Sequence, residues 1–582
     1  MIDKTPTKLR RRIKEACDLR KKSTQRSKPL KDEYHCFQES NEQSPLNHPF
    51  EWNANVIGAL AYSNPNIRVT EMGFEDHETQ ATEIAMRNLV MRHDYGFATI
   101  ARRWAIDCQF DFAVGFVSPE PTPDYAGASD IVPMWPRIRR VPPVLYFRDA
   151  RTPERGGSPE FEGHMWIKPY RMLLEARNAD GSPKYDEVAL SALQKEEGLV
   201  ELRRDMMQEG IHLDLDDELI VGYEVFFHET QSWVTVGFAG EEAHFLRPEG
   251  ERPYSGPTGG PYHMWGIFES DDQVYPVPPL VVTAALAADI NRHRKQISED
   301  AGCAKRLIVV NAASQGIIGN IQGAASNSIL SIPGFNGMVS QVDLGGPTKE
   351  SYEYSAFTTE KLDRLSGLTE IARGNVDGAA TATAVAQAGA FTDARLRYMQ
   401  SVFTEGCEVI LSKAADLCMS SADIAFPIVI QDEVSGGAIR GTFYGGQIDP
   451  VGATVWRRNV YCKIEPFSMG YTNQQQQRDS MIQAIDTGIA VINAATLNPA
   501  IKPGPILDTL YDTLNVPDAS RKFFDIDMLA VQQQMTQQSM LMGMAPPAPG
   551  APPGKGKEPP APPGQPASRP GGLVQGMPSP VG

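Results

Sequence analysis

The chain lacks the signatures of the common enzyme and membrane-protein classes. Among its 582 residues there is no GxxxxGK(S/T) phosphate-binding loop and no GxSxG nucleophile motif, and His228-Glu229 does not continue into HExxH. Those motifs hold the phosphate, the nucleophile or the zinc in the enzymes that carry them. No apolar run approaches the roughly 20 residues that a membrane-spanning helix needs. The sequence therefore predicts a soluble protein that is not an enzyme and has no membrane partner.

Cysteine is scarce, and no two cysteines have a CxxC spacing. The seven are Cys17, Cys36, Cys108, Cys303, Cys407, Cys418 and Cys462. An odd number without paired spacing argues against a disulfide framework or a zinc site and favours reduced thiols in a cytoplasm. The acidic run from Asp214 to Glu218 lies beside His212 but lacks the glycine-containing spacing of a calcium loop. We interpret it as a solvated turn, and we expect neither a metal nor a cofactor.

Charge is unevenly distributed along the chain. The formal net charge is −17, yet residues 1–32 carry twelve Lys or Arg against four acidic residues, about +8, which leaves about −25 for the remainder. The favoured interpretation of this basic arm is a solvated, partly helical tail. The alternative is an electrostatic contact to nucleic acid or to an acidic partner. The arm has no interleaved aromatic residues, so base stacking has no support there.

Helical and extended patterns alternate along the first half of the chain, which predicts an α+β protein. Helical patterns cover residues 75–91 and 97–117. Residues 118–275 are rich in β-branched and aromatic residues, with strands expected at 144–147, 219–227 and 233–236 and a charged helix at 186–209.

A helix, a small β insert and a second helix are expected next. Pro276, Pro278 and Pro279 introduce a helix that runs to about residue 304. Short extended runs follow at 307–310, 328–332 and 338–342, and then a helix over about 358–372 and a long helix over about 382–419. Residues 471–542 have helical patterns, whereas the last 37 residues contain 13 Pro and 8 Gly and are expected to be disordered.

The junction between the last two helices before the C-terminal region carries the most informative motif. Residues 366–387 read SGLTEIARGNVDGAATATAVAQ: a helix end, a loop containing Gly374 and Gly378, and a helix start with alternating Ala and Thr. This segment resembles the region around the tunnel loop of the portal proteins of tailed bacteriophages, which form the ring-shaped head-to-tail connector. The preceding order of helix, β insert and helix is also similar to that family.

The resemblance implies a portal-like ring subunit with a wing, a helical stem, a small β clip, a tunnel loop and a helical crown. The corresponding segments are a basic N-terminal arm (1–45), wing (46–275), first stem helix (276–304), clip (305–356), second stem helix (357–373), tunnel loop (374–381), long helix with strands returning to the wing (382–470), crown (471–545) and a Pro/Gly-rich tail (546–582).

The family implies a function and a set of partners as well. Portals occupy one capsid vertex of the virion, after assembly in the host cytoplasm, and conduct DNA during packaging and ejection. The resemblance implies a homo-oligomeric ring, usually of twelve subunits. Its expected partners are double-stranded DNA in the channel, the terminase large subunit, the major capsid and scaffolding proteins, and head-completion or tail adaptor proteins.

The tunnel loop is the candidate site. By resemblance, Arg373, Asn375, Asp377 and Thr381 line the DNA channel, with Arg373 or Asn375 offering each passing phosphate a weak contact. The alternative is an ordinary helix connection in which Arg373 caps the carbonyls of its own helix. Two other function classes remain open: another virion structural protein, such as a tail adaptor or minor capsid protein, and an enzyme whose active-site residues are scattered.

Overall fold

The structure is a computed structural model that divides into two units, residues 1–477 and 478–582. In the first unit it describes residues 5–36, 47–71, 77–123, 132–178, 181–193, 219–239, 242–303, 305–311, 329–332, 339–344, 346–366, 382–431, 438–446, 460–464 and 469. In the second it describes Ile482 and residues 485–491, which are helical. Helices and strands both contribute extensively, so the α+β class is confirmed.

The N-terminal part of the first unit is helical. Its elements are α1 (Pro6–Thr24), α2 (Lys28–Tyr34), α3 (His48–Leu60), β1 (Ile67–Glu71), α4 (His77–Met91) and α5 (Phe97–Phe110). The start of α3 has the expected chemistry, because the Asn47 side chain accepts a hydrogen bond from the Phe50 amide and Pro49 occupies the first turn. The glycine before α5, Gly96, has a φ of 68°, a conformation that costs other residues strain.

Two antiparallel sheets follow. β10 (Tyr262–Trp265), β2 (Ala113–Pro121) and β3 (Met134–Arg140) form one, in that order. The larger sheet has the order β4-β5-β6-β7-β8, with β9 beside β7: β4 (Tyr146–Arg148), β5 (Phe161–Pro169), β6 (Leu219–Phe227), β7 (Ser232–Ala239), β8 (Glu242–Phe245) and β9 (Glu251–Pro253). Short helices η1 (Pro153–Arg155), α6 (Tyr170–Glu175) and α7 (Glu187–Leu193) connect these strands.

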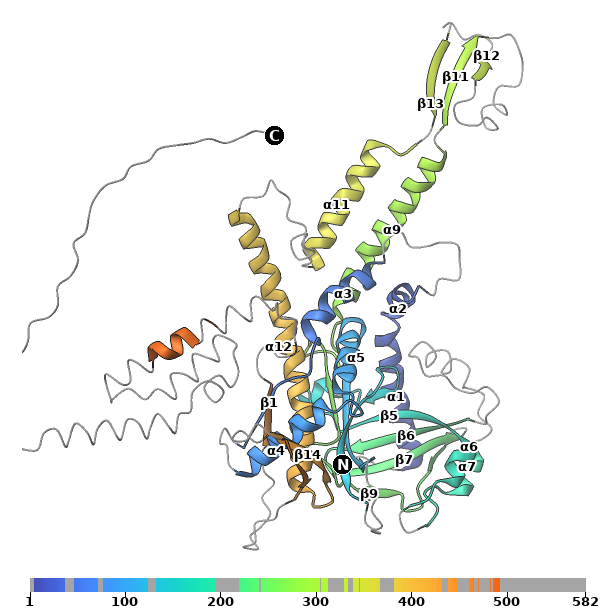
Figure 1. Ribbon diagram of the computed structural model, residues 1–582. Helices are drawn as coiled ribbons and strands as arrows, with labels where there is room; N and C mark the ends of the chain where they lie inside the picture. Colours follow the sequence, from blue (N-terminus) through green and yellow to red (C-terminus); the bar gives the residue numbers. More distant parts are fainter. Residues whose placement is uncertain are drawn as a thin grey trace, which may run out of the picture. The chain divides into compact units, whose positions relative to one another are not determined.

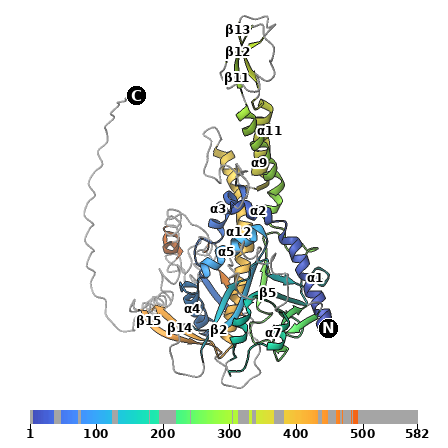
Figure 2. The same cartoon turned by 90° about the vertical axis from the view of Figure 1, so that its right-hand side faces the viewer.

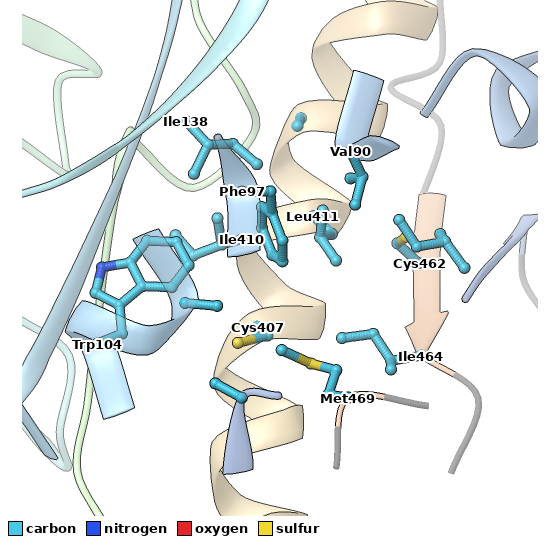
Figure 3. Packing of buried hydrophobic residues seen from close by; sticks show 14 of the residues in the cluster. Val90, Phe97, Trp104, Ile138, Cys407, Ile410, Leu411, Cys462, Ile464 and Met469 are labelled. Atoms are coloured by element: carbon cyan, nitrogen blue, oxygen red, sulfur yellow. The ribbon is translucent and has the colours of Figure 1, made fainter. Parts of the chain in front are cut away.

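The 39-residue helix α12 (Ala382–Ser420) contributes its C-terminal part, from Leu396 to Met419, to the main core. Figure 3 shows Cys407, Ile410 and Leu411 of α12 packed among side chains of α5 and β3 on one side and of α4 and β16 (Val460–Ile464) on the other. β16 pairs with β1, while β14 (Ala425–Gln431) and β15 (Ala438–Tyr444) form a separate hairpin. The buried Glu408 carboxylate of α12 accepts the Ile464 amide at 2.8 Å and so holds β16 against the helix.

The expected helix, β insert and helix are present. α9 (Pro279–Cys303) leads into β11 (Lys305–Asn311), β12 (Ile329–Ile332) and β13 (Val339–Leu344), and α11 (Lys349–Ser366) follows. Figures 1 and 2 show α9 and α11 side by side, with the three strands beyond their ends. The insert strands and the ends of α9 and α12 lie within two or three residues of their expected positions.

Three expectations from the sequence were wrong in detail. The basic arm is not a solvated tail, because α1 is a helix that buries Leu9, Ile13 and Ala16 against the larger sheet. The helix expected over residues 97–117 ends at Phe110, because the alternating residues that follow pair as β2. α11 begins at Lys349 rather than near 357, because the Thr348 hydroxyl accepts the Ser351 amide and caps it.

Candidate functional site

The three-stranded insert, here called the tip sheet (β11, β12 and β13), is built on the strand that follows α9. β11 is central: it pairs in parallel with β12 from Ile308 opposite Ile329, and antiparallel with β13 from Lys305 opposite Leu344. Lys305 comes two residues after the end of α9, and Leu344 comes five residues before the start of α11. The sheet is therefore joined to the far ends of both helices.

The helix pair (α9 and α11) has a buried inner half. On α9, Leu280, Thr283, Ala287 and Ile290 are buried, and a hydrogen bond between His48 and Thr283 (3.3 Å) joins this half to the body. At the boundary with the outer half, Asn291 donates to Glu33 at 3.2 Å. On α11 the buried residues are Thr358, Leu362 and Ser366. This half of the pair is fixed to the body of the same subunit.

The outer half of the pair, residues 291–302 with 349–357, has no buried side chain. Instead it presents Tyr352 (54% exposed), Tyr354 and Phe357 (51% exposed) to solvent. Tyr354 links the two helices: its hydroxyl donates to Asp289 at 3.1 Å, and its ring lies 4.5 Å from that of His293. The hydrogen bond to Asp289 raises the pKa of Tyr354. Apolar surface without cover is the main physical feature of this half.

The four residues expected to line the channel, Arg373, Asn375, Asp377 and Thr381, lie within residues 367–381, outside the described residues. The ends of the helices on either side are described. Arg395 of α12 donates from Nη1 to the Leu365 carbonyl oxygen at 2.7 Å, which fixes the C-terminal end of α11 against α12 about four turns from the start of that helix. A cation at this position also suits the negative end of the α11 dipole.

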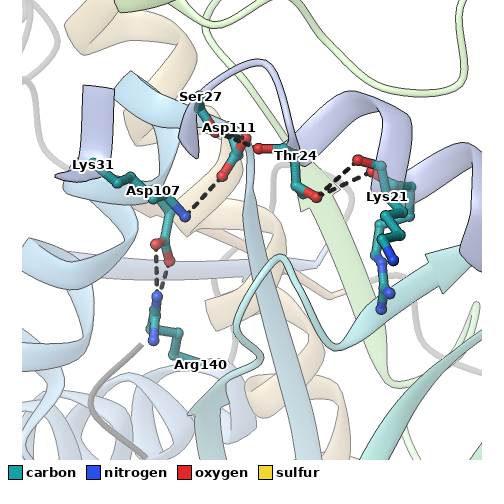
Figure 4. A network of polar contacts seen from close by, with 8 residues as sticks. Lys21, Thr24, Ser27, Lys31, Asp107, Asp111 and Arg140 are labelled. Atoms are coloured by element: carbon teal, nitrogen blue, oxygen red, sulfur yellow. Dashed lines mark hydrogen bonds and ion pairs between the residues drawn. The ribbon is translucent and has the colours of Figure 1, made fainter. Parts of the chain in front are cut away.

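A second group of polar residues, which sequence reasoning missed, anchors the N-terminal helices. The Arg12 guanidinium lies 3.0 Å from both Asp149 and Glu160, and the two carboxylates are almost fully buried. Figure 4 shows Lys31 and Ser27 of the α2 region on Asp111, with Asp107 and Arg140 forming a neighbouring pair. The spacing of Leu9, Ile13 and Ala16 was the available signal for a packed helix.

The structure also contains a polar cavity of about 670 Å³ that the sequence did not predict. It lies between the end of the larger sheet, the turn after β4, the segment around β10 and α12, and its wall includes Arg148, Glu162, His228, His263 and Lys413. Because these residues come from four distant segments, no local spacing in the sequence could have grouped them.

Glu162 and His263 have displaced pKa values in this cavity. Burial alone would raise the pKa of Glu162, but hydrogen bonds from His228 (2.8 Å) and Tyr146 (2.5 Å), together with the nearby charges of His228 and Arg148, bring it below its usual value. Burial and the neighbouring Lys413 lower the pKa of His263 to about 3. The cavity therefore holds an ionised carboxylate and a neutral imidazole near pH 7.

Comparison with known proteins gives no assignment. No family model matches the chain, and no curated protein matches it. Within the described ranges, no cluster of three His, Cys, Asp or Glu side chains is arranged to hold a metal ion. The described helices include none with the length and hydropathy required to cross a membrane. The acidic run at Asp214–Glu218 lies outside the described residues.

Proposed function

We propose that this protein is the subunit of a portal ring in a tailed bacteriophage, with the helix pair as its stem, the tip sheet as its clip and residues 374–381 as its tunnel loop. The observation that carries the proposal is one continuous arrangement: α9, a three-stranded sheet, α11, a 15-residue connection and the 39-residue α12. The role is structural, with DNA as cargo and no catalytic residue.

The uncovered outer half of the helix pair supports assembly. Between residues 291–302 and 349–357 the two helices have no fully buried side chain, and each exposed pair of side chains contributes only a few tenths of a kcal/mol. Exposed Tyr and Phe side chains gain more when a neighbouring subunit covers them. Copies of the pair packed side by side in a closed ring supply that cover for every subunit.

The length of the connection between α11 and α12 supports a loop that reaches beyond the helices. Arg395 is 13 residues into α12, so the contact at Leu365 lies about 20 Å along that helix from its start. An extended chain spans about 20 Å with roughly six residues. Fifteen residues, 367–381, are available. The surplus is enough for a projection that narrows a central channel.

The test is the assembly state of the purified full-length chain. Mass photometry is expected to show a particle near 770 kDa, about twelve chains of 63.9 kDa, and negative-stain images are expected to show a ring with a central hole. A monomer at micromolar concentration in every buffer tested would refute the proposal. A defined assembly without a central hole would favour another virion structural protein.

A deletion tests the clip assignment separately. Replacing residues 306–345 by a short Gly/Ser linker removes the tip sheet but retains Thr348, which caps α11. The deleted chain is expected to form rings that no longer bind the terminase large subunit. Binding equal to that of the full ring would show that the tip sheet is not the docking element.

A further inference from the structure

The polar cavity beside the larger sheet has the composition of a ligand site. It has a volume of about 670 Å³ and is lined by charged side chains from β5, from the end of β4 and from α12. A cavity of this size holds a small molecule rather than a single water. Its charged groups decide which chemistry it accepts.

The buried carboxylate of Glu162 is already committed to partners inside the protein. Oε2 accepts from the Tyr146 hydroxyl and Oε1 from His228 Nε2. The other two carboxylates of the wall, Glu269 and Asp271, belong to exposed residues, where water screens them. A metal cation therefore finds no unpartnered buried carboxylate among the described residues of this wall.

The two basic side chains of the wall have donors to spare, although burial lowers the pKa of the Lys413 ammonium group. Arg148 donates from Nη2 to the Gly157 carbonyl oxygen at 2.8 Å, which uses one of the five N–H donors of its guanidinium group. Lys413 donates to the carbonyl oxygens of Gly260 (2.7 Å) and Thr258 (3.4 Å), two of the three bonds that an ammonium group can make. An anion in the cavity can accept charge-assisted hydrogen bonds from the donors that these contacts leave over.

We propose that this cavity binds a small oxyanion, a phosphate or carboxylate group, through Arg148 and Lys413. His263 lies in the same wall, stacked at 5.4 Å on Trp265, and offers a neutral ring nitrogen as a further hydrogen-bonding group. The site is independent of the proposed portal role, because it lies on the side chains of one subunit and requires no ring.

The experiment is a calorimetric titration of the full-length chain with sodium phosphate and, in a second arm, with sodium citrate, at an ionic strength held constant with sodium chloride. Saturable binding in the millimolar range or tighter is expected. Arg148→Gln and Lys413→Met are each expected to weaken it about tenfold or more, since each removes a charge-assisted hydrogen bond. Arg139→Gln is the matched control, because Arg139 is 58% exposed and does not line the cavity.

The two arms separate the sources of the anion: tighter binding of phosphate or of citrate identifies the preferred group. Absence of saturable binding by wild type up to about 50 mM of either anion overturns the proposal, as does equal loss in the Arg139→Gln control. Binding of magnesium chloride in place of the anions also overturns it. If the charge variants fail to fold, Val409→Phe fills the cavity from α12 without removing a charge, and unchanged anion binding in that variant contradicts the assignment.

Discussion

The body around α12 and the outer half of the helix pair bury their apolar side chains to very different extents. Phe403, Cys407 and Ile410 of α12 are fully buried in the main core, whereas Tyr352 and Phe357 of α11 are more than half exposed. Both helices belong to the same unit of the chain. The contrast separates a region whose apolar side chains are buried within the chain from one whose aromatic side chains face solvent.

The difference in burial implies that the two regions are stabilised to different extents within the chain. Burying a large apolar side chain contributes about 1.5–3 kcal/mol, so α12 is held firmly by its own subunit. The outer half of the helix pair has no fully buried side chain and therefore lacks this contribution; in the proposed ring, a neighbouring chain would supply it. Mutations in the two regions are therefore expected to change different quantities: the free energy of unfolding in the body, and assembly in the helix pair.

The largest effect is expected in the core. Phe403→Ala removes a fully buried ring from α12 and leaves a cavity, which lowers the free energy of unfolding by about 3–5 kcal/mol. Phe357→Ala is the matched change in the exposed region and is expected to cost less than about 1 kcal/mol. Urea denaturation of the two variants under conditions that keep the chain monomeric measures both. Equal losses would remove the distinction between the two regions.

The anchor of α1 gives the next effect. Arg12→Ala leaves Asp149 and Glu160 buried without their cation, and a loss of about 3 kcal/mol is expected. Arg11→Ala, at the position next to Arg12, removes an exposed ion pair with Glu15 and is expected to change stability by less than about 0.5 kcal/mol. Thermal unfolding compares the variants, and hydrogen exchange in α1 locates the change. A small effect of Arg12→Ala would show that α1 is held by its apolar face alone.

An acid dependence is expected from His263. Its pKa is about 3 in the folded protein against 6.5 for an ordinary histidine, so the unfolded chain takes up a proton below pH 6.5 that the folded chain does not. This contribution to stability is complete above pH 6.5 and falls by about 2 kcal/mol between pH 6.5 and 5. His263→Gln is expected to flatten the profile of unfolding free energy over that range. Parallel profiles for wild type and variant would contradict the assignment.

Sequence reasoning located the elements whose patterns are local. Proline at the start of α9, the alternating strands of the tip sheet and the Ala/Thr start of α12 each determine structure within a few residues, and all three lie near their expected positions. The start of α11 was predicted about eight residues too late, because its first turns are polar and aromatic and lack the apolar stripe of a packed helix. Its Thr348 cap was the signal that remained.

Tertiary partners could not be derived in the same way. Arg12 meets Asp149 and Glu160, which are 137 and 148 residues away, and the choice depends on how α1 lies on the sheet. The polar cavity has the same origin, because Lys413 reaches the wall only through the position of α12. The candidate channel residues lie between α11 and α12, as expected from the sequence, but outside the described residues.

Charged substitutions of the exposed aromatic residues test whether these side chains act in assembly rather than in folding. Tyr352→Glu with Phe357→Glu is expected to leave the free energy of unfolding within about 1 kcal/mol of wild type, because both side chains are exposed in the subunit. Ring assembly is expected to fall sharply, since the change buries carboxylates at the proposed contact between neighbours. Mass photometry measures the assembled fraction. Val188→Glu, at a 78% exposed position on α7, is the control, and rings of normal yield from the double variant would contradict the stem assignment.

The smallest effect on stability is expected from the connection between α11 and α12. Arg373→Ala with Asn375→Ala removes two side chains proposed to touch passing DNA, and both unfolding and ring assembly are expected to remain as in wild type. Packaged virions are then expected to retain less DNA, because a weak contact repeated once per subunit is lost from the whole constriction. Arg395→Ala is the comparison, because it leaves the side chains of the loop unchanged. It removes the hydrogen bond to the Leu365 carbonyl oxygen and is expected to lower the free energy of unfolding by about 0.5–1.5 kcal/mol. Genome retention per virion, measured beside ring yield, separates the two. If the double variant fails to form rings, the segment is a packing element rather than a DNA contact. Arg373 then caps the carbonyl groups of its own helix, as in the alternative interpretation.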